Sequence, residues 1–215
     1  MRFRLATWNI NSVRLRLELV ERFVRAEKPD VLCLQEIKCQ EEQFPRAAFE
    51  AMGFPHIAVT GQKGYHGVAT VSKIPIKKMD RLDLCRDGHA RHVSVVLDDG
   101  LAGRKPLTLH NFYVPAGGDV PDPEANDKFR HKLDFLDALT AWSGAHKTKT
   151  KNRLILVGDL NVAPLPSDVW SHKQLLIVVS HTPPETERMA QLLASHDWID
   201  VMRRHVPPEE TLFTW

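Results

Sequence analysis

Residues 153–161 read Arg153-Leu154-Ile155-Leu156-Val157-Gly158-Asp159-Leu160-Asn161, an apolar run that stops at a glycine and continues into an acid and an amide two places apart. Consecutive aliphatic residues are typical of a strand that is covered on both faces. Open α/β sheets bind ligands beyond the carboxyl ends of their strands, and residues i and i+2 of an extended chain point the same way. The stretch therefore predicts a buried strand that presents Asp159 and Asn161 to one bound group.

A simpler interpretation competes with this one, because Gly-Asp followed by Asn is also a common turn after any strand. The same layout recurs elsewhere in the chain. Residues 3–8 alternate as a strand does and lead to Asn9 and Asn11, residues 31–34 form an apolar run that leads to Glu36, and residues 107–112 lead to Tyr113. This repetition favours a shared site, built from several strand ends, over a set of unrelated turns.

Length and composition indicate one globular domain, with 215 residues of which 43% are apolar and 26% charged. The apolar runs are far shorter than the roughly 18 residues of a membrane span, so we expect a cytoplasmic protein that does not interact with membranes. Three cysteines without paired spacing argue against a disulfide framework and a structural zinc site. The net charge of +2 is too small to indicate a nucleic-acid-binding protein by itself.

Hydrophobic periodicity and turn residues predict an alternation of strands and helices. We expect strands at 3–9, 31–34, 56–60, 67–73, 92–97, 107–113 and 153–159, and helices at 13–28, 43–52, 124–142 and 185–195. The basic run from His146 to Arg153 is expected to be an exposed loop. A strand followed by Asn-x-Asn near the start, and one followed by Asp-x-Asn about 150 residues later, favour two related halves.

An ordered set of short motifs resembles the exonuclease III family of apurinic/apyrimidinic endonucleases, within the endonuclease/exonuclease/phosphatase superfamily. The motifs run from residue 7 to the last residue and are Thr7-Trp8-Asn9-Ile10-Asn11-Ser12-Val13-Arg14, Leu34-Gln35-Glu36-Ile37-Lys38, Gly64-Tyr65-His66-Gly67-Val68-Ala69, Asn111-Phe112-Tyr113-Val114-Pro115 and Gly158-Asp159-Leu160-Asn161. The fold implied by the resemblance is a four-layer α/β sandwich, in which two packed mixed sheets are flanked by helices.

The resemblance implies a site that hydrolyses a phosphodiester. Such an enzyme must neutralise charge, orient water and support the departing oxygen. A carboxylate such as Glu36 is a hard oxygen ligand that suits Mg²⁺ or Mn²⁺, and the resemblance adds Asn9 and Asn11 at the metal end. Asp159 is then expected to orient or deprotonate the attacking water, and Asn161 to hold the phosphate or the water.

Tyr113 has two interpretations. By resemblance its hydroxyl points at the scissile phosphate or the leaving oxygen, whereas a phenol at a strand end also commonly anchors the edge of a core by one hydrogen bond.

The partner implied is double-stranded DNA with abasic sites or 3′ ends, bound by a monomer. Lys38, Arg91 and Lys132 match basic positions that approach the DNA backbone in the family, and the alternative for each is a solvated surface. Phe213 and Trp215 lie in a segment that resembles the aromatic wall around a sugar without its base.

The family carries further acidic and Ser-Asp-His groups that have no match in residues 1–215. We therefore expect a single domain over 1–215 that is truncated before the last motifs, with its C-terminal part missing.

The predicted function is a divalent-metal-dependent DNA phosphodiesterase of base excision repair, which incises at abasic sites and removes nucleotides or blocking groups from 3′ ends. Two alternatives remain open at this point. One is a phosphoinositide or nucleotide phosphatase of the same superfamily, and the other is a catalytically inactive nucleic-acid-binding module.

Overall fold

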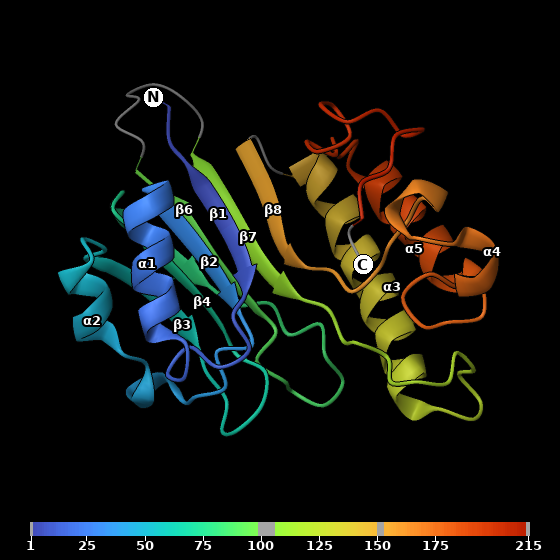
Figure 1. The fold of residues 1–215 in the computed structure, drawn as a ribbon, viewed down its shortest axis with the longest axis horizontal. Helices are drawn as coiled ribbons and strands as arrows, with labels where there is room; N and C mark the ends of the chain where they lie inside the picture. The colour runs from blue at the N-terminus through green and yellow to red at the C-terminus, as the bar shows by residue number, and fades with distance from the viewer. Residues whose placement is uncertain (1, 99–105, 150–152, 214–215) are drawn as a thin grey trace. The chain divides into compact units, whose positions relative to one another are not determined.

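Eight strands form two mixed four-stranded sheets in the computed structural model, which describes residues 2–98, 106–149 and 153–213. The first sheet has the order β1-β2-β4-β3 (Figure 1), and the second has the order β5-β6-β7-β8. The strands of the first sheet are β1 (Leu5–Asn9), β2 (Val31–Gln35), β3 (His56–Thr60) and β4 (Val68–Ser72). Those of the second are β5 (Ile76–Asp80), β6 (His92–Leu97), β7 (Leu107–Tyr113) and β8 (Arg153–Asp159).

Both sheets repeat one pairing pattern. In the first sheet β1 pairs parallel to β2, and the remaining pairs are antiparallel. In the second sheet β8 pairs parallel to β7, and again the remaining pairs are antiparallel. A parallel pair needs a long crossover connection, which contains helix α1 (Leu17–Glu27) in the first case and α3 (Asp127–Lys149) in the second. The repeated pattern agrees with the two related halves expected from the sequence.

Alternating side chains of the first sheet fill two separate cores. Val31 and Cys33 of β2 pack between the two sheets, together with residues of β6 and β7 such as Val95 and Leu109. Leu32 and Leu34 face the other way and pack under α1 and α2 (Arg46–Ala51), which lie on the same side of the sheet (Figure 1). A strand that packs on both faces is apolar throughout, as β2 is.

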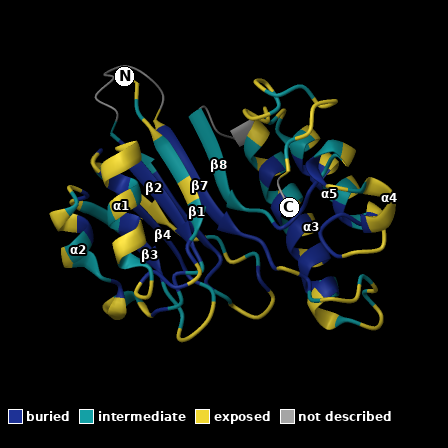
Figure 2. Cartoon of the chain, viewed as in Figure 1, coloured by how far each residue is buried: buried dark blue, intermediate teal, exposed yellow. Residues whose placement is uncertain are grey.

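Strand β8 departs from the expectation. Every residue of β8 is half-buried, whereas every residue of β7 is buried (Figure 2). The cause is position, since β8 lies at the edge of its sheet and β7 lies between two neighbours. The prediction that β8 is covered on both faces is therefore wrong, although its bounds and its direction toward the polar residues are as expected.

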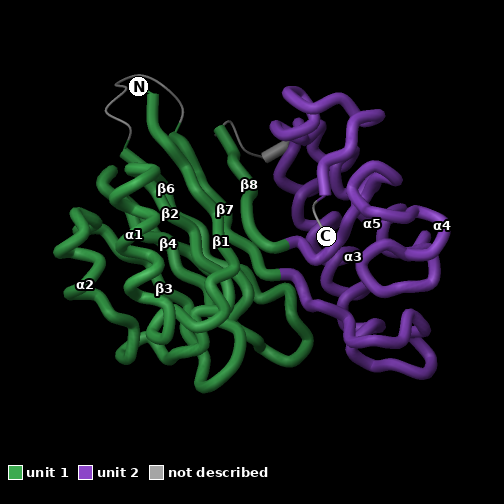
Figure 3. The backbone as a smooth tube through the Cα atoms, in the orientation of Figure 1, with its two compact units in different colours: residues 1–113, 151–159 green, residues 114–150, 160–215 purple. Residues whose placement is uncertain are grey.

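The contacts within the chain divide it into two compact units (Figure 3). The first unit holds both sheets and consists of residues 1–113 and 151–159; the second consists of residues 114–150 and 160–215. In the second unit α3 packs against α5 (Pro183–Ser195), and the shorter elements are η2 (Pro166–Asp168) and α4 (His172–Leu175). In the remainder of the first unit, η1 (Glu41–Gln43) precedes α2.

Helix α3 is longer than the sequence predicts. It continues through His146 to Lys149, so the first part of the basic run is helical and not a loop. In the described part of the chain, none of the helices combines the length and the apolar composition that crossing a bilayer requires.

Candidate active site

Two parallel strand pairs deliver the polar residues that follow the apolar runs. Asn9 is the last residue of β1 and pairs with Gln35, the last residue of β2, which directly precedes Glu36. Tyr113 ends β7 and pairs with Asp159, which ends β8. Because the two sheets pack face to face in the first unit, these four strand ends provide side chains to one place.

Hydrogen bonds join these side chains directly. The Nδ2 group of Asn9 donates to Oε1 of Glu36 at 2.8 Å and to Oδ2 of Asp159 at 2.7 Å. The hydroxyl of Tyr113 donates to the same Oε1 of Glu36 at 2.9 Å. Residues separated by up to 150 positions in the chain thus form one cluster of two carboxylates, an amide and a phenol.

Gly158 permits the close approach of β7 and β8 just before the site. It has a φ of 143° and lies opposite Phe112, and a Cβ atom in its place would stand 1.9 Å from the Phe112 carbonyl oxygen. Any other residue would push the strands apart. The glycine that ends the apolar run is therefore required for β8 to place Asp159 beside Tyr113.

The backbone at Glu36 turns its side chain toward the cluster. Neighbouring residues of a strand point to opposite faces. Glu36 has a φ of 51°, so the extended conformation ends there, and the consecutive side chains of Gln35 and Glu36 both reach β1 and β7. Left-handed conformations of non-glycine residues are costly and concentrate at functional sites, and Asn11 and Lys38 share this feature with φ values of 46° and 50°.

Lys38 and Asn11 extend the cluster toward solvent. The Nζ atom of Lys38 lies 3.0 Å from Oε2 of Glu36 and donates to Oδ1 of Asn11 at 2.5 Å. The backbone N–H of Asn11 donates to Oδ1 of Asn9 at 3.1 Å. A cation thus already contacts oxygen atoms of Glu36 and Asn11, two of the residues that the sequence assigns to a metal.

The environment keeps Glu36 ionised and Tyr113 protonated. Burial acts to raise the pKa of the Glu36 carboxyl, but hydrogen bonds from Asn9, Lys38 and Tyr113 outweigh it and hold the pKa below its ordinary value. Burial raises the pKa of the Tyr113 phenol well above its usual range, and the nearby Glu36 charge raises it further. At neutral pH the site therefore combines a carboxylate with a phenol that keeps its proton.

Arg91 does not present its charge to solvent. Its exposed fraction is 6%, its NH1 group donates to the Tyr113 carbonyl at 3.2 Å, and its guanidinium carbon lies 4.9 Å from the centre of the Tyr113 ring. The prediction that Arg91 contacts the DNA backbone is wrong for this structure. Stacking and a hydrogen bond make Arg91 a support for Tyr113 instead.

Lys132 is also misassigned by the sequence. Its side chain is fully buried, and its ammonium forms an ion pair with the equally buried Glu185. It also donates to the carbonyls of Asn161 at 2.5 Å and Ala116 at 3.2 Å, and to the Ser180 hydroxyl at 3.1 Å. A lysine with this many buried partners anchors the second unit, so the predicted contact with DNA is wrong.

Asn161 belongs to the second unit, whereas Asp159 belongs to the first. The Nδ2 group of Asn161 donates to the Val114 carbonyl at 2.9 Å, and its own carbonyl accepts the hydrogen bond from Lys132. Phe213, in the same unit, is 63% exposed, and Trp215 lies outside the described residues. The structure thus joins Asn9, Glu36, Tyr113, Asp159, Lys38 and Asn11 in the first unit and describes Asn161 and Phe213 in the second.

Two residues near the site were missed by the sequence analysis. Gln35 and Asn111 are buried amides that hydrogen-bond to each other at 2.7 Å, directly beneath Glu36 and Tyr113. The signal that could have identified them is an amide inside an otherwise apolar strand, which must find a partner when it is buried.

The described donor set fits a hard divalent cation. The side-chain oxygens of Glu36, Asn9 and Asn11 are carboxylate and amide oxygens, which Mg²⁺ and Mn²⁺ prefer over nitrogen or sulfur. Glu36 stays ionised near neutral pH because its pKa is lowered, so it does not need to lose a proton first.

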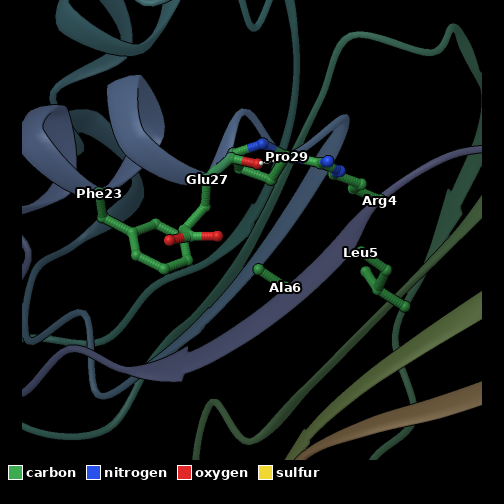
Figure 4. A pocket seen from close by; sticks show the side chains of 6 residues that line it. All are labelled: Arg4, Leu5, Ala6, Phe23, Glu27 and Pro29. Atoms are coloured by element: carbon green, nitrogen blue, oxygen red, sulfur yellow. Dashed lines mark hydrogen bonds between the residues drawn. The ribbon is translucent and has the colours of Figure 1, made fainter.

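A hollow in the first unit lies elsewhere. It is lined by Arg4, Leu5, Ala6, Phe23, Glu27 and Pro29, at the amino end of β1 (Figure 4). Arg4 donates from its guanidinium to the Glu27 carbonyl at 2.7 Å and from its backbone N–H to Asp30 at 2.7 Å, which joins β1 to the end of α1. These contacts give Arg4 a structural role, and the cluster of Asn9, Glu36, Tyr113 and Asp159 is at the other end of the strand.

Known proteins resemble this chain over nearly its whole length. Exodeoxyribonuclease III of Haemophilus influenzae is 29% identical over an alignment that covers 97% of this chain and 78% of that protein. An AP endonuclease from Archaeoglobus fulgidus has a TM-score of 0.84 at 28% identity, covering 100% of this chain and 78% of the other. A variant of the 3′ phosphatase NExo from Neisseria, bound to a product DNA hairpin, has a TM-score of 0.83 at 28% identity, with coverages of 100% and 78%.

These comparisons confirm the predicted α/β sandwich and the predicted resemblance to exonuclease III and apurinic/apyrimidinic endonucleases. Such nucleases depend on a divalent metal. A profile of the endonuclease/exonuclease/phosphatase family matches residues 6–198, a range that contains every residue of the cluster. The chain therefore belongs to the endonuclease/exonuclease/phosphatase family.

Proposed function

We propose that this chain is a divalent-metal-dependent DNA phosphodiesterase of base excision repair, which incises at abasic sites and processes 3′ ends. The observation that carries the proposal is the hydrogen-bonded cluster of Asn9, Glu36, Tyr113 and Asp159 at four strand ends. The cluster combines the groups that phosphodiester hydrolysis needs, namely oxygen ligands, an acceptor for water and a donor for the phosphate.

Glu36 would hold the metal, with Asn9 and Asn11 beside it. When bound, a divalent cation neutralises phosphate charge and supports the departing oxygen. We favour Mg²⁺, with Mn²⁺ as the other candidate, because both take oxygen ligands and keep positions for water and substrate. Lys38 contacts the same oxygens of Glu36 and Asn11, so it would turn toward the DNA backbone when a metal and a phosphate are present.

Asp159 is the candidate for orienting or deprotonating the attacking water. Asn9 holds Oδ2 of Asp159 in place and leaves the carboxylate its acceptor character. Tyr113 keeps its proton at neutral pH because its pKa is raised, so its role would be to donate a hydrogen bond to the phosphate. Asn161, two residues after Asp159 in the chain, would hold the phosphate or the water with its amide.

The choice of DNA damage rests on what the relatives are named for. Two of them are an exodeoxyribonuclease and an AP endonuclease, and a third is a 3′ phosphatase bound to a DNA hairpin. These names support DNA over a phosphoinositide as the substrate, and they support both abasic sites and 3′ ends as its damaged features. We propose Phe213 and Trp215 as the aromatic wall for the abasic sugar, and a cytoplasmic monomer as the active form.

The test compares three duplexes of equal length: one with a single abasic analogue, one intact, and one with a 3′-phosphate end. We expect incision of the first and trimming of the third with Mg²⁺, and no cutting after chelation of the metal. Asp159→Asn serves as the matched inactive control. Equal cutting of intact and abasic duplex would contradict the damage preference, and cutting in excess chelator would contradict the metal requirement.

A further inference from the structure

A buried bridge of amide side chains connects the two sheets directly below the active-site cluster. Nε2 of Gln35 on β2 donates to Oδ1 of Asn111 on β7 at 2.7 Å and to Oγ1 of Thr7 on β1 at 3.0 Å. Nδ2 of Asn111 donates to the backbone carbonyls of Leu34 at 3.2 Å and Ala69 at 2.9 Å, which belong to the other sheet. Gln35 and Asn111 are only 1% and 0% exposed.

Each side chain of the bridge lies one or two residues before a site residue. Thr7 is two residues before Asn9, and Asn111 is two before Tyr113; residues i and i+2 of a strand face the same side and lie about 7 Å apart. Gln35 directly precedes Glu36, whose positive φ brings its side chain to the same side as that of Gln35. The bridge and the cluster therefore link the same three strands.

Apolar packing alone would not hold the site residues in register. Glu36 and Tyr113 come from different sheets, and their hydrogen bond of 2.9 Å depends on how the sheets are placed along each other. Hydrophobic contacts are non-directional, so they resist separation of the sheets more than sliding. Hydrogen bonds weaken steeply with distance and angle, so the donors of Asn111 fix β7 against the backbone of β2 and β4.

We propose that Gln35 and Asn111 are positioning residues, which set the distance between Glu36 and Tyr113 and thereby tune the site. The inference rests on the proposed function insofar as turnover is one of its readouts. Two buried amides are costly in an apolar core unless they are fully hydrogen-bonded, and a well-satisfied pair of this kind specifies one arrangement of its strands. Neither residue touches the substrate in this proposal.

Gln35→Met tests the proposal, because it removes the bridge with little change in side-chain volume. Thr70→Val is the matched control, since the Thr70 hydroxyl lies 3.6 Å from Cys33 Sγ in the same buried core but contacts neither sheet's site residues. The chain has two tyrosines, so incorporation of 3-fluorotyrosine in a Tyr65→Phe background leaves one fluorine signal, from Tyr113. The fluorine chemical shift at neutral pH then reports the surroundings of this ring.

We expect Gln35→Met to move the fluorine signal of Tyr113 at neutral pH, because the hydrogen bond from its hydroxyl to the Glu36 carboxylate loosens. On a DNA duplex that the parent cuts, kcat should fall roughly ten- to a hundredfold, with KM within about twofold, as expected for a site displaced by a fraction of an ångström. Thr70→Val should change neither quantity.

The proposal is overturned if Gln35→Met, at stability matched to Thr70→Val, leaves both the Tyr113 fluorine shift and kcat at the parent values. If Gln35→Met does not fold, Thr7→Val replaces it, since Thr7 is exposed and the substitution removes only the outer acceptor of Gln35. Thr7→Val should change both readouts in the same direction by a smaller amount, and no change in either overturns the proposal. A parent that cuts no DNA would refute the proposed function alone, because the fluorine measurement needs no substrate.

Discussion

Two charged clusters, one in each unit, differ in how far their charges are enclosed. In the first unit, Glu36 is half-buried, receives hydrogen bonds from an amide, a phenol and a lysine, and remains accessible at the strand ends. In the second unit, Lys132 and Glu185 are fully buried and satisfied within the protein. The comparison shows that a charged residue near a motif acts on a ligand only where the fold leaves part of it open, and otherwise stabilises the fold.

The largest effect is expected on turnover, from a change in the partly exposed cluster of the first unit. Asp159→Asn keeps the shape of the side chain but removes the charge that orients or deprotonates water, so turnover should fall by about a thousandfold. Asn9 can still contact the new amide oxygen, so DNA affinity should stay within about twofold of the parent, as expected when only the transition state loses an interaction. Incision rates and fluorescence anisotropy on the abasic duplex measure the two quantities. A variant that retains full activity would show that the cluster is not the catalytic centre.

The second-largest effect is expected on stability, from a change in the buried pair of Lys132 and Glu185. Lys132→Met leaves Glu185 buried with the N–H groups of Ser180 and Thr182 but without a cation. Breaking a buried ion pair costs about 3–5 kcal/mol, whereas replacing both partners with apolar residues is often close to neutral. We therefore expect Lys132→Met to lower the free energy of unfolding by that amount and Lys132→Met/Glu185→Met to recover much of it. Urea unfolding of both variants measures these free energies. If the single and the double variant lose equal stability, the ion pair is not the main contribution of Lys132.

How much of the fold the sequence can predict also depends on how far residues are buried. Apolar runs and turn residues locate strands well, so β3, β6 and β7 have the expected bounds. Strand β5 was missed, because four of its five residues are exposed and Lys77, Lys78 and Asp80 hide the apolar pattern. Edge position also escaped prediction, because the half-burial of β8 depends on strand order and not on its own residues.

Site residues divide along similar lines. Asn9, Glu36, Tyr113 and Asp159 could be predicted to share a site because each ends or directly follows an apolar strand, whereas the roles of Asn9 and Tyr113 came from the family resemblance. Lys132 and Arg91 could not, since a basic residue in a helix or a loop looks the same in sequence whether its charge meets solvent or a buried partner. Their partners, Glu185 and the Tyr113 carbonyl, come from distant segments that only the fold brings close.

A third titratable residue, His92, is buried like Lys132 but carries no charge. The Leu82 N–H donates to Nδ1 of His92 at 2.9 Å, so neutral His92 carries its proton on Nε2, which lies 3.0 Å from Nδ1 of His110. Burial and, to a smaller extent, the neighbouring His110 lower the pKa of His92 to about 2. An imidazole enclosed in this way has to remain neutral for the first unit to stay folded.

The sign of the pH effect follows. The unfolded chain binds this proton near pH 6.5 and the folded chain does not, so the contribution of His92 to stability is present above about pH 6.5 and is lost as the pH falls. The loss should amount to about 1.4 kcal/mol per pH unit below that point. Urea unfolding between about pH 6.5 and pH 5 should show a shallower slope in His92→Gln than in the parent. His56→Gln is the matched control, and an unchanged slope in His92→Gln would exclude His92 as the source.

The smallest effect is expected for Lys38, the cation of the open cluster. Lys38→Met removes an ammonium from Oε2 of Glu36 and from Oδ1 of Asn11, both of which we assign to the metal. Partly exposed ion pairs contribute about 0.2–1 kcal/mol, so stability should barely change, and the Mg²⁺ concentration for half-maximal activity should fall by about two- to fivefold. DNA binding should weaken slightly and lose part of its salt dependence, because one contact with a phosphate is gone. If Lys38→Met instead destabilises the protein as much as Lys132→Met does, the distinction between the partly exposed Lys38 and the buried Lys132 is wrong. If the prediction holds, the two lysines differ in effect because water and ligand can replace the partners of Lys38, whereas the partner of Lys132 is enclosed by the fold.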